Sequence, residues 1–514
     1  NEVLSKTSIL RATDDTTRVE QGIDSGEGNE ISAAILEYVE RQFFSQAFTG
    51  HNEFDTDFAT HMFDWRLAYS RTDREEPDRR QYTYFNNNLS TSAFERRWSD
   101  LVEDSIDVVA DYTLPLDWGD YNTTEIKAGI LWSDKDREVE LYRFGIRQGD
   151  IRDISLSIDQ DLEKDILPYQ NFVIDRFRLA ANTTDTDSYD SAEEIQAYYL
   201  NTNTDLGDAW SFGLGARVED YTTEREYPNE PGSSNELEFD DWTPAASLTW
   251  RPTEEWLVRV GWSETVSYPG LIERSESLSY DPETDDPIFG NPDLQVSTIE
   301  NLDARLEYYF SDTESVSLAI FGKEIDQPIE RAIPDASGSA ARGITFRNQD
   351  SADLFGVEVD INKNILDRDE YLLWIGGNVS YIDSEVELSD DSLRLEGESA
   401  NGRQLQGQSE WLANFQVGFD HYPTEQKVTL LVNYFDDRIF RIARGETNGP
   451  EFESARVLVD LTYSWLFGQD LEWSLDAQIK NLFNEDVEYE QNNNVIESYQ
   501  NGTVFKIGIS YEFY

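Results

Sequence analysis

The chain ends with TVFKIGISYEFY, residues 503–514. Every second position of this stretch carries an apolar side chain: Phe505, Ile507, Ile509, Tyr511 and Phe513. The positions between them hold Lys506, Gly508, Ser510 and Glu512. Because successive side chains of a β-strand point to opposite faces, this alternation predicts a terminal strand with one apolar face and one polar face.

The same alternation recurs along the chain, with charged or polar residues between the apolar ones. The clearest examples are Phe63, Trp65, Leu67 and Tyr69; Leu302, Ala304, Leu306, Tyr308 and Phe310; Phe355, Val357, Val359 and Ile361; and Val457, Val459, Leu461, Tyr463 and Trp465. This recurrence predicts an all-β protein. Alternation alone fits both a soluble sandwich, whose apolar faces pack together, and a membrane barrel, whose apolar face contacts lipid.

The connections between the predicted strands separate these two folds. Short connections alternate with long ones: the short ones lie at 251–255, 311–314, 421–426 and 467–471, and the long ones at 267–297, 385–404 and 484–500. An up-and-down barrel with short turns on one rim and long loops on the other produces this pattern, and a Greek-key sandwich does not require it.

Tryptophans bracket the short connections, as Trp250 and Trp256 do for one and Trp465 and Trp473 for another. Such placement favours an aromatic girdle at the membrane interface over cross-strand packing in a soluble sheet. We therefore expect a transmembrane antiparallel up-and-down β-barrel with about 18 strands in this chain.

Composition excludes several functions. The 514 residues include 41 basic and 104 acidic side chains, giving a net charge of −63, so the field around the chain repels nucleic-acid phosphates. The absence of cysteine excludes disulfides and thiolate sites. The three histidines, His51, His61 and His421, lack metal-ligand spacing, and no Gly-x-Ser-x-Gly motif occurs. We therefore expect a protein that is not an enzyme and that needs no cofactor.

Several stretches resemble TonB-dependent outer-membrane receptors. The clearest is GNPDLQVSTIENLDARLEYYF, residues 290–310. Further similar stretches are HMFDWRLAYSRTDREEPD at 61–78, EEIQAYYLNTNTDLGDAWSFGLGARVE at 193–219, NQDSADLFGVEVD at 348–360 and IKNLFNEDVEY at 479–489. Together they cover most of the chain from about residue 55. The resemblance implies a barrel in the bacterial outer membrane with long extracellular loops.

The resemblance also has limits. This chain has Val296 where the family often has proline, and Tyr268-Pro269 where Arg-Pro is common. The family's N-terminal plug domain and its partner-binding motif do not occur in this sequence. Family barrels have about 22 strands, so residues 1–514 are expected to form the C-terminal portion of such a barrel, as one domain.

The resemblance singles out two groups of residues. The first is the family-motif loop and the strand after it, with Gly290, Asn291, Pro292, Leu294, Asn301 and Asp303. Asn-Pro favours turn initiation, so a role in shaping the loop is expected ahead of substrate contact. The second group is the barrel assembly signal of the terminal strand, with Gly508, Tyr511 and Phe513.

Acidic clusters on the long loops are weak candidates for Ca²⁺ binding, because hard oxygen ligands suit that ion. The candidates are Asp281, Glu283, Asp285 and Asp286. Their spacing does not follow a calcium-binding loop, so a solvated acidic surface is the favoured reading. Inward aromatic residues such as Tyr309 and Trp374 suit stacking on sugars, although single inward aromatics more often pack.

Three functions remain open from the sequence. The first is import of a scarce solute such as a ferric siderophore, an oligosaccharide or a peptide. Its partners would be outer-membrane lipid, a plug domain, a TonB-type energy-coupling complex, the barrel assembly machinery and the solute. The second is a passive porin, because about 18 strands can close without a plug. The third is a structural or adhesive surface barrel.

Overall fold

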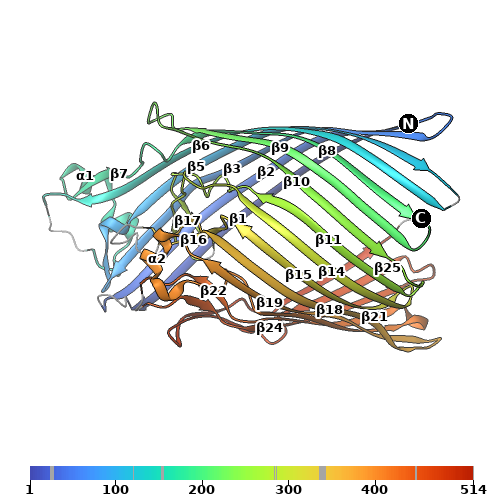
Figure 1. The fold of residues 1–514 in the computed structure, drawn as a ribbon. Coiled ribbons are helices and arrows are strands. Elements are labelled where there is room, and N and C mark those ends of the chain that lie inside the picture. Colours follow the sequence, from blue (N-terminus) through green and yellow to red (C-terminus); the bar gives the residue numbers. More distant parts are fainter. Residues whose placement is uncertain are drawn as a thin grey trace. The chain divides into compact units, whose positions relative to one another are not determined.

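The computed structural model describes residues 1–23, 28–119, 121–151, 156–282, 284, 286–334, 343–445 and 448–512. Strands dominate it (Figure 1). Helices are few and short: α1 (Tyr169–Val173) and α2 (Asp390–Glu396) have five and seven residues. Among the described residues, no helix combines the length and the apolar composition needed to cross a membrane.

Twenty of the described strands belong to one hydrogen-bonded sheet. Two of them are short, β4 (Asn88–Leu89) and β7 (Phe177–Ala181). The other eighteen are β1 (Glu2–Ile23), β2 (Glu30–Asp55), β3 (Thr60–Phe85), β5 (Glu95–Asp117), β6 (Asn122–Gln148), β8 (Tyr189–Leu206), β9 (Trp210–Glu226), β10 (Ser234–Trp250), β11 (Trp256–Ser267), β14 (Ser297–Ser311), β15 (Glu314–Asp326), β18 (Ser351–Asp367), β19 (Tyr371–Glu387), β20 (Trp411–His421), β21 (Gln426–Phe435), β24 (Arg456–Phe467), β25 (Trp473–Lys480) and β28 (Val504–Tyr511). The predicted number of strands is confirmed.

The long strands pair antiparallel with their neighbours in the chain. From β14 to β15, for example, the register runs from Thr298 opposite Asp326 to Ser311 opposite Glu314. The same up-and-down pairing continues through β18, β19, β20, β21, β24, β25 and β28. Strand connectivity is therefore that of the expected up-and-down barrel.

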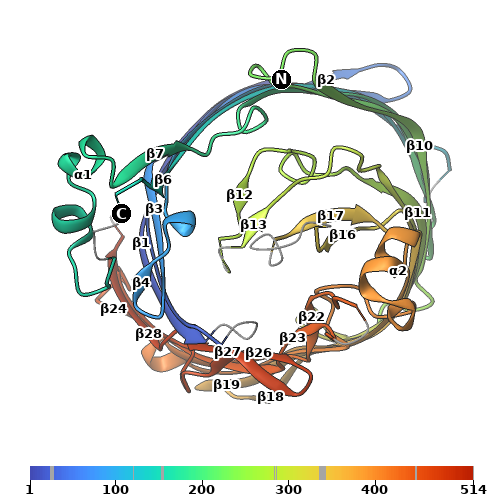
Figure 2. The same ribbon diagram turned by 90° about the vertical axis from the view of Figure 1, so that its left-hand side faces the viewer.

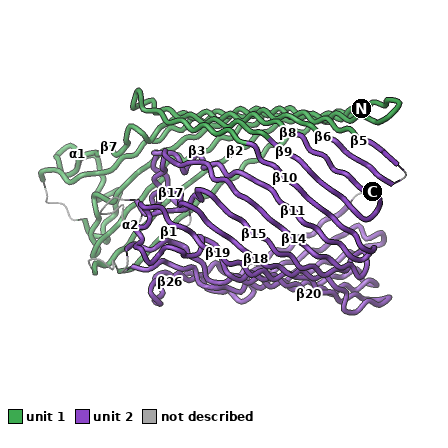
Figure 3. Tube along the Cα trace, in the orientation of Figure 1, with its two compact units in different colours: residues 1–114, 127–199, 218–241 green, residues 115–126, 200–217, 242–514 purple. Residues whose placement is uncertain are grey.

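The chain divides into two compact units (Figure 3). Unit 1 comprises residues 1–114, 127–199 and 218–241, and unit 2 comprises 115–126, 200–217 and 242–514. In unit 1, β2 and β3 each have 26 residues. A membrane-crossing strand needs about 9–11 residues, so these strands extend well beyond a bilayer.

In unit 2 the apolar face of the sheet is open. Leu302 is 57% exposed, Leu318 45% and Phe355 52%, although each is a large apolar side chain. In a sandwich these positions would be sealed against a second sheet. The exposed apolar face is the one expected to contact lipid, and we call it the outer face; the face that carries Asn301 and Arg305 is the inner face.

The terminal strand follows the same rule. Residues of β28 pair with β25, from Trp473 opposite Tyr511 to Lys480 opposite Val504. Phe505, Ile507 and Ile509 are 70%, 77% and 65% exposed on the outer face. The apolar stripe at the end of this acidic chain is therefore a surface for lipid and not part of a protein core.

Buried apolar clusters lie mainly outside the regular part of the sheet. In unit 1, Leu89, Phe94, Ile146, Ile166 and Phe177 form one cluster beside α1 and β7. In unit 2, Ile288, Leu294, Ile344 and Phe346 form another, between two long connections. The connections of unit 2 are thus packed structures with cores of their own.

Candidate functional site

Five long connections of unit 2 leave the sheet at the same end, because the strands on either side of each one pair antiparallel. They span residues 268–296, 327–350, 388–410, 436–455 and 481–503. We call them together the loop assembly. It contains β12 (Ser279–Tyr280), β13 (Pro287–Ile288), β16 (Ile329–Ala332), β17 (Thr345–Asn348), β22 (Arg438–Arg441), β23 (Glu451–Glu453), β26 (Asp486–Gln491) and β27 (Asn494–Gln500). Figure 2 shows β12, β13, β16 and β17 on the concave side of the unit 2 strands.

Backbone hydrogen bonds join consecutive connections into one structure. Phe289 donates to the carbonyl of Ile344 at 2.8 Å, which links the first connection to the second. Gly407 donates to Ile439 at 2.9 Å, which links the third to the fourth. Strand β23 pairs with β26, which links the fourth to the fifth. These bonds join the first connection to the second, and the third to the fourth and fifth.

The family-motif loop lies in the first connection, where its residues are held by backbone contacts. A Cβ atom at Gly290 would lie 2.2 Å from the carbonyl oxygen of Ser275, so this position has no room for a side chain. The backbone N–H of Asn291 donates to Glu273 at 2.6 Å, and its side-chain amide donates to the carbonyl of Phe346 at 3.0 Å. These contacts fix the loop against the second connection.

The next motif residues continue this anchoring. The carbonyl oxygen of Pro292 accepts hydrogen bonds from the guanidinium of Arg274 at 3.0 and 3.3 Å. Leu294 is fully buried in the cluster that contains Ile344 and Phe346. These contacts hold the loop in place, and the role of its residues stays a prediction.

Asn301 and Asp303 lie apart from that loop, on the inner face of β14. The amide of Asn301 donates to Ser263 at 3.2 Å and to the hydroxyl of Thr265 at 3.1 Å, and its oxygen accepts from Lys323 at 2.6 Å. Asp303 is exposed. The six motif residues are therefore divided between a loop and a strand, and a direct role in substrate binding stays a prediction.

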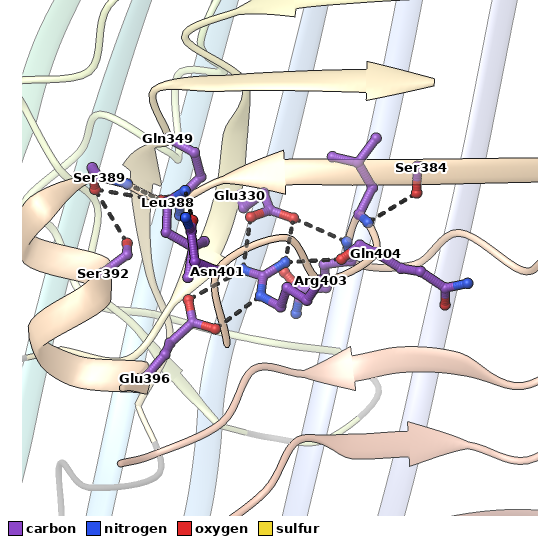
Figure 4. Close-up of polar contacts among 12 residues, drawn as sticks. Glu330, Gln349, Ser384, Leu388, Ser389, Ser392, Glu396, Asn401, Arg403 and Gln404 are labelled. Carbon is purple, nitrogen blue, oxygen red and sulfur yellow. Dashed lines mark hydrogen bonds and ion pairs between the residues drawn. The ribbon is translucent and has the colours of Figure 1, made fainter. Parts of the chain in front are cut away.

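A buried ion-pair cluster joins the second and third connections (Figure 4). The guanidinium of Arg403 donates to Glu330 at 2.9 and 3.1 Å and to Glu396 at 2.8 and 3.1 Å. Glu330 and Glu396 are only 5% and 1% exposed. The two bidentate contacts of this one arginine fix the orientation of both carboxylates and place a positive charge beside each of them.

Local sequence explains how Glu396 reaches this position. Helix α2 follows Ser389 and carries Asp390 and Asp391 in its first turn, where the free backbone N–H groups favour negative charge. The helix ends before Gly397, whose φ is +101°. Burial raises the pKa of Glu396, and the hydrogen bond from Arg403 opposes that rise. Burial lowers the pKa of Arg403, but the hydrogen bonds that its guanidinium donates to both glutamates outweigh this effect, so its pKa is raised.

Arginines also engage the two described Ca²⁺ candidates, Asp281 and Asp286. Arg331 pairs with Asp281 at 2.9 Å, and Arg441 pairs with Asp286. Glu283 and Asp285, the other two Ca²⁺ candidates, lie outside the described residues. Within the described part of the chain, no group of three or more acidic or histidine side chains is arranged to hold a metal ion. The Ca²⁺ hypothesis stays a prediction with weaker support, because two of its four carboxylates already face cations.

The residues expected to form the barrel assembly signal lie on or next to β28. Gly508 faces Asp476 across the sheet, and the ring of Tyr511 lies 4.8 Å from that of Trp473. Phe513 lies outside the described residues. The structure places Tyr511 with the aromatic residues near the short turns, and its role in assembly stays a prediction.

Sequence reasoning missed the Arg403 cluster. Glu330 and Arg403 are 73 positions apart, and no spacing rule connects them. The only local signal is that both lie in long connections with buried apolar neighbours. In contrast, the histidines lie elsewhere: His51 and His61 are on β2 and β3, and His421 bonds Thr424 in a short turn at the opposite end of β20.

Comparison with known proteins agrees with the β-barrel fold described above. Residues 8–482 match the model of the family described as TonB dependent receptor-like, beta-barrel. Similar solved structures include the siderophore receptor PiuA from Acinetobacter baumannii, with a TM-score of 0.56, 14% identity and coverage of 99% of this chain and 80% of that one. The ferric yersiniabactin uptake receptor FyuA from Yersinia pestis has a TM-score of 0.54 and 13% identity, with coverage of 100% of this chain and 76% of that one. The outer membrane transporter YddB from Escherichia coli has a TM-score of 0.55 and 12% identity, with coverage of 99% of this chain and 73% of that one. Comparison with curated protein sequences gives no match.

The family model spans nearly the whole chain, and the strand pairing, the open apolar face and the elaborate loops agree with it. The chain therefore belongs to the TonB-dependent receptor family, as a β-barrel of the bacterial outer membrane that serves TonB-dependent transport.

Proposed function

We propose that this barrel imports a scarce solute, which the loop assembly of unit 2 captures before transport. The observation that carries this proposal is the continuity of that assembly: five connections joined by backbone hydrogen bonds and buried ion pairs. Loops that only connect strands need no such cores. An ordered surface at the long-loop end suits selective capture, because ordering the loops in advance lowers the entropy cost of binding.

The proposal includes the partners of an energised importer. A plug domain would close the path, and a TonB-type complex would supply the energy to displace it. The barrel assembly machinery would insert the chain, reading the terminal strand. The proteins of similar structure are named for siderophore and ferric yersiniabactin uptake, so a ferric chelate is one candidate solute, beside an oligosaccharide and a peptide.

An uptake experiment tests this proposal. Cells that produce the intact receptor are given labelled ferric chelates and labelled oligosaccharides, with and without a protonophore. Energised import predicts uptake that saturates with concentration and that the protonophore abolishes. Uptake that rises linearly and ignores the protonophore would instead identify a passive porin, and no uptake of any solute would favour a structural or adhesive role.

A further inference from the structure

A row of carboxamides crosses three neighbouring strands on the inner face of unit 2. Asn378 on β19 lies opposite Asn414 on β20, which lies opposite Asn433 on β21. The amide of Asn433 donates to Asn414 at 2.7 Å, and the amide of Asn414 donates to Asn378 at 2.9 Å. We call these three residues the carboxamide row.

The carboxamide row lies in a groove of about 560 Å³ on this face. Other inner-face side chains that line it are Ser315, Asp360, Asn362, Gln416, Leu431, Leu458 and Asp460. Five of the lining residues are therefore asparagine or glutamine, and two are leucine. A site of this size accommodates a small organic solute or one portion of a longer one.

The carboxamides retain hydrogen-bonding capacity for a ligand. Each amide has two N–H donors and an oxygen with two lone pairs, and a link of the row uses one donor and one lone pair. Asn414 and Asn433 are exposed on the inner face. The row thus offers donors and acceptors side by side, which complements hydroxyl groups, since a hydroxyl both donates and accepts.

The charge of the groove disfavours an anionic ligand. Asp360 accepts hydrogen bonds from Arg305 at 3.0 Å and from Ser317 at 2.9 Å, so its charge is partly offset. Asp460 accepts from the backbone of Asn481 at 2.9 Å. Inside a chain of net charge −63, a groove of amides without an arginine in its lining suits an anionic solute poorly.

An aromatic ring lies on the inner face on each side of the carboxamide row. The indole of Trp374 covers Gly418, where a Cβ would lie 2.1 Å from the ring. The ring of Phe321 covers Gly356, where a Cβ would lie 2.2 Å from it. Both glycines are needed for these rings to lie close against the strands.

The two rings are placed at similar distances from the row, in opposite directions. Trp374 precedes Asn378 by four residues on β19, toward the short-turn end. Gly356 precedes Asp360, the partner of Asn378, by four residues on β18, toward the loop assembly. Four residues of strand span about 13 Å, so the order along the wall is ring, amides, ring.

We infer that this face of unit 2 is a binding track for neutral, hydroxyl-rich solutes, that is, oligosaccharides. Sugar hydroxyls would bond the carboxamide row, and the C–H faces of the sugar rings would pack on Trp374, Phe321 and the two leucines. The inference rests on the proposed import function and names its substrate class. It also gives Trp374 a role in place of packing alone.

The test uses the intact receptor, both purified and in cells, with maltohexaose, cellohexaose, laminarihexaose and xylohexaose as neutral probes and ferrichrome as a ferric chelate. At least one hexasaccharide is expected to bind and to be taken up. Trp374→Leu and Asn414→Ala are each expected to weaken its binding about tenfold, the size expected from one aromatic or amide contact. Trp374→Phe is expected to restore most of the loss.

Matched control variants distinguish the loss of a contact in the track from a general loss of stability caused by a substitution. Gln478→Ala removes an inner-face amide outside the groove, and Trp411→Leu removes an outer-face tryptophan. Both are expected to bind the hexasaccharide like the unaltered receptor. Gel migration before and after heating shows whether each variant has folded.

The outcomes distinguish this inference from the import proposal. Binding and energised uptake of ferrichrome without any hexasaccharide would overturn the saccharide track and leave import standing. Equal binding by Trp374→Leu, Asn414→Ala and the control variants would also overturn the track. Absence of energised uptake for every solute would instead overturn the proposed import itself.

Discussion

At the scale of single residues, Arg403 is the cation on which two loops depend. It is almost fully buried and contacts two buried carboxylates. Removing one partner of a buried ion pair is costly because the remaining charge has lost both its water and its counter-ion. Here the loss of one arginine would leave two such charges, Glu330 and Glu396.

We therefore expect Arg403→Met to loosen the contact between connections 327–350 and 388–410, at a cost of about 3–5 kcal/mol. Hydrogen–deuterium exchange of the receptor in detergent measures this as faster exchange in both connections. Arg394→Met is the matched control, because Arg394 pairs with Asp391 at 3.2 Å on an exposed surface. Equal exchange in the two variants would show that the Arg403 cluster does not hold the loops.

Acidity offers a second test at the same site. Burial raises the pKa of Glu396 in the folded loop. Between the ordinary and the raised pKa, the folded loop therefore binds more protons than the unfolded loop, and its stability falls as pH rises through this range. Mild acidification is thus expected to slow hydrogen exchange in α2 by more than the accompanying fall in the intrinsic, base-catalysed exchange rate of the amides.

The variant Glu396→Gln removes the titrating group and keeps an oxygen that accepts from Arg403. Its exchange in α2 is expected to vary less with pH than that of the unaltered receptor, over the range just above the ordinary pKa of glutamate. The same pH dependence in both proteins would show that another group controls this loop.

At the scale of structural elements, the sequence predicted strands much better than loops. Each strand depends on alternation within about ten residues, which is a local pattern, and the expected total of about 18 strands agrees with the eighteen long strands of the described sheet. Alternation did not indicate the break between β17 and β18. The two strands are separated at Gln349, a fully buried residue whose side-chain oxygen accepts from the backbone of Ser389.

The loop assembly could not be predicted in the same way. Its contacts join residues far apart in sequence, such as Asp286 and Arg441 at 155 positions. The Asn-Pro signal predicted only that residues near Gly290 shape a loop, and it gave no partner for that loop. The carboxamide row likewise depends on the register between three strands, and this register cannot be predicted from the sequence of any one of them.

Gly290 gives a prediction at this scale. Gly290→Ala would place a methyl group against the backbone of Ser275 and Ile272, which cannot move without shifting the first connection. We expect a destabilisation of about 1–3 kcal/mol, as for overpacking elsewhere. Limited proteolysis should cut residues 268–296 faster in this variant.

A second glycine in the same connection provides the control. An added Cβ at Gly270 would meet the flexible carboxylate of Glu273 at 3.4 Å, an ordinary contact. Gly270→Ala is therefore expected to resist proteolysis like the unaltered receptor. If both variants were cut at the same rate, the close packing of Gly290 would not be what holds this loop.

At the scale of the whole molecule, function depends on the separation of two faces. The outer face of unit 2 exposes large apolar side chains, and the inner face carries ion pairs and amides. Membership of the TonB-dependent receptor family places the chain in the outer membrane, where lipid covers the first face. In the function proposed above, the solute path follows the second face. The loop assembly and the proposed saccharide track both belong to that path.

Spin labels on three consecutive residues of β15 test this separation most directly. The chain has no cysteine, so Leu318→Cys, Ala319→Cys and Ile320→Cys each give one labelling site. Leu318 and Ile320 lie on the outer face, and Ala319 lies between them on the inner face. In bilayer vesicles, labels at 318 and 320 are expected to collide readily with dissolved oxygen and rarely with a water-soluble nickel chelate, whereas oxygen collisions should drop at 319. Equal oxygen access at all three positions would contradict the assignment of the outer face to lipid.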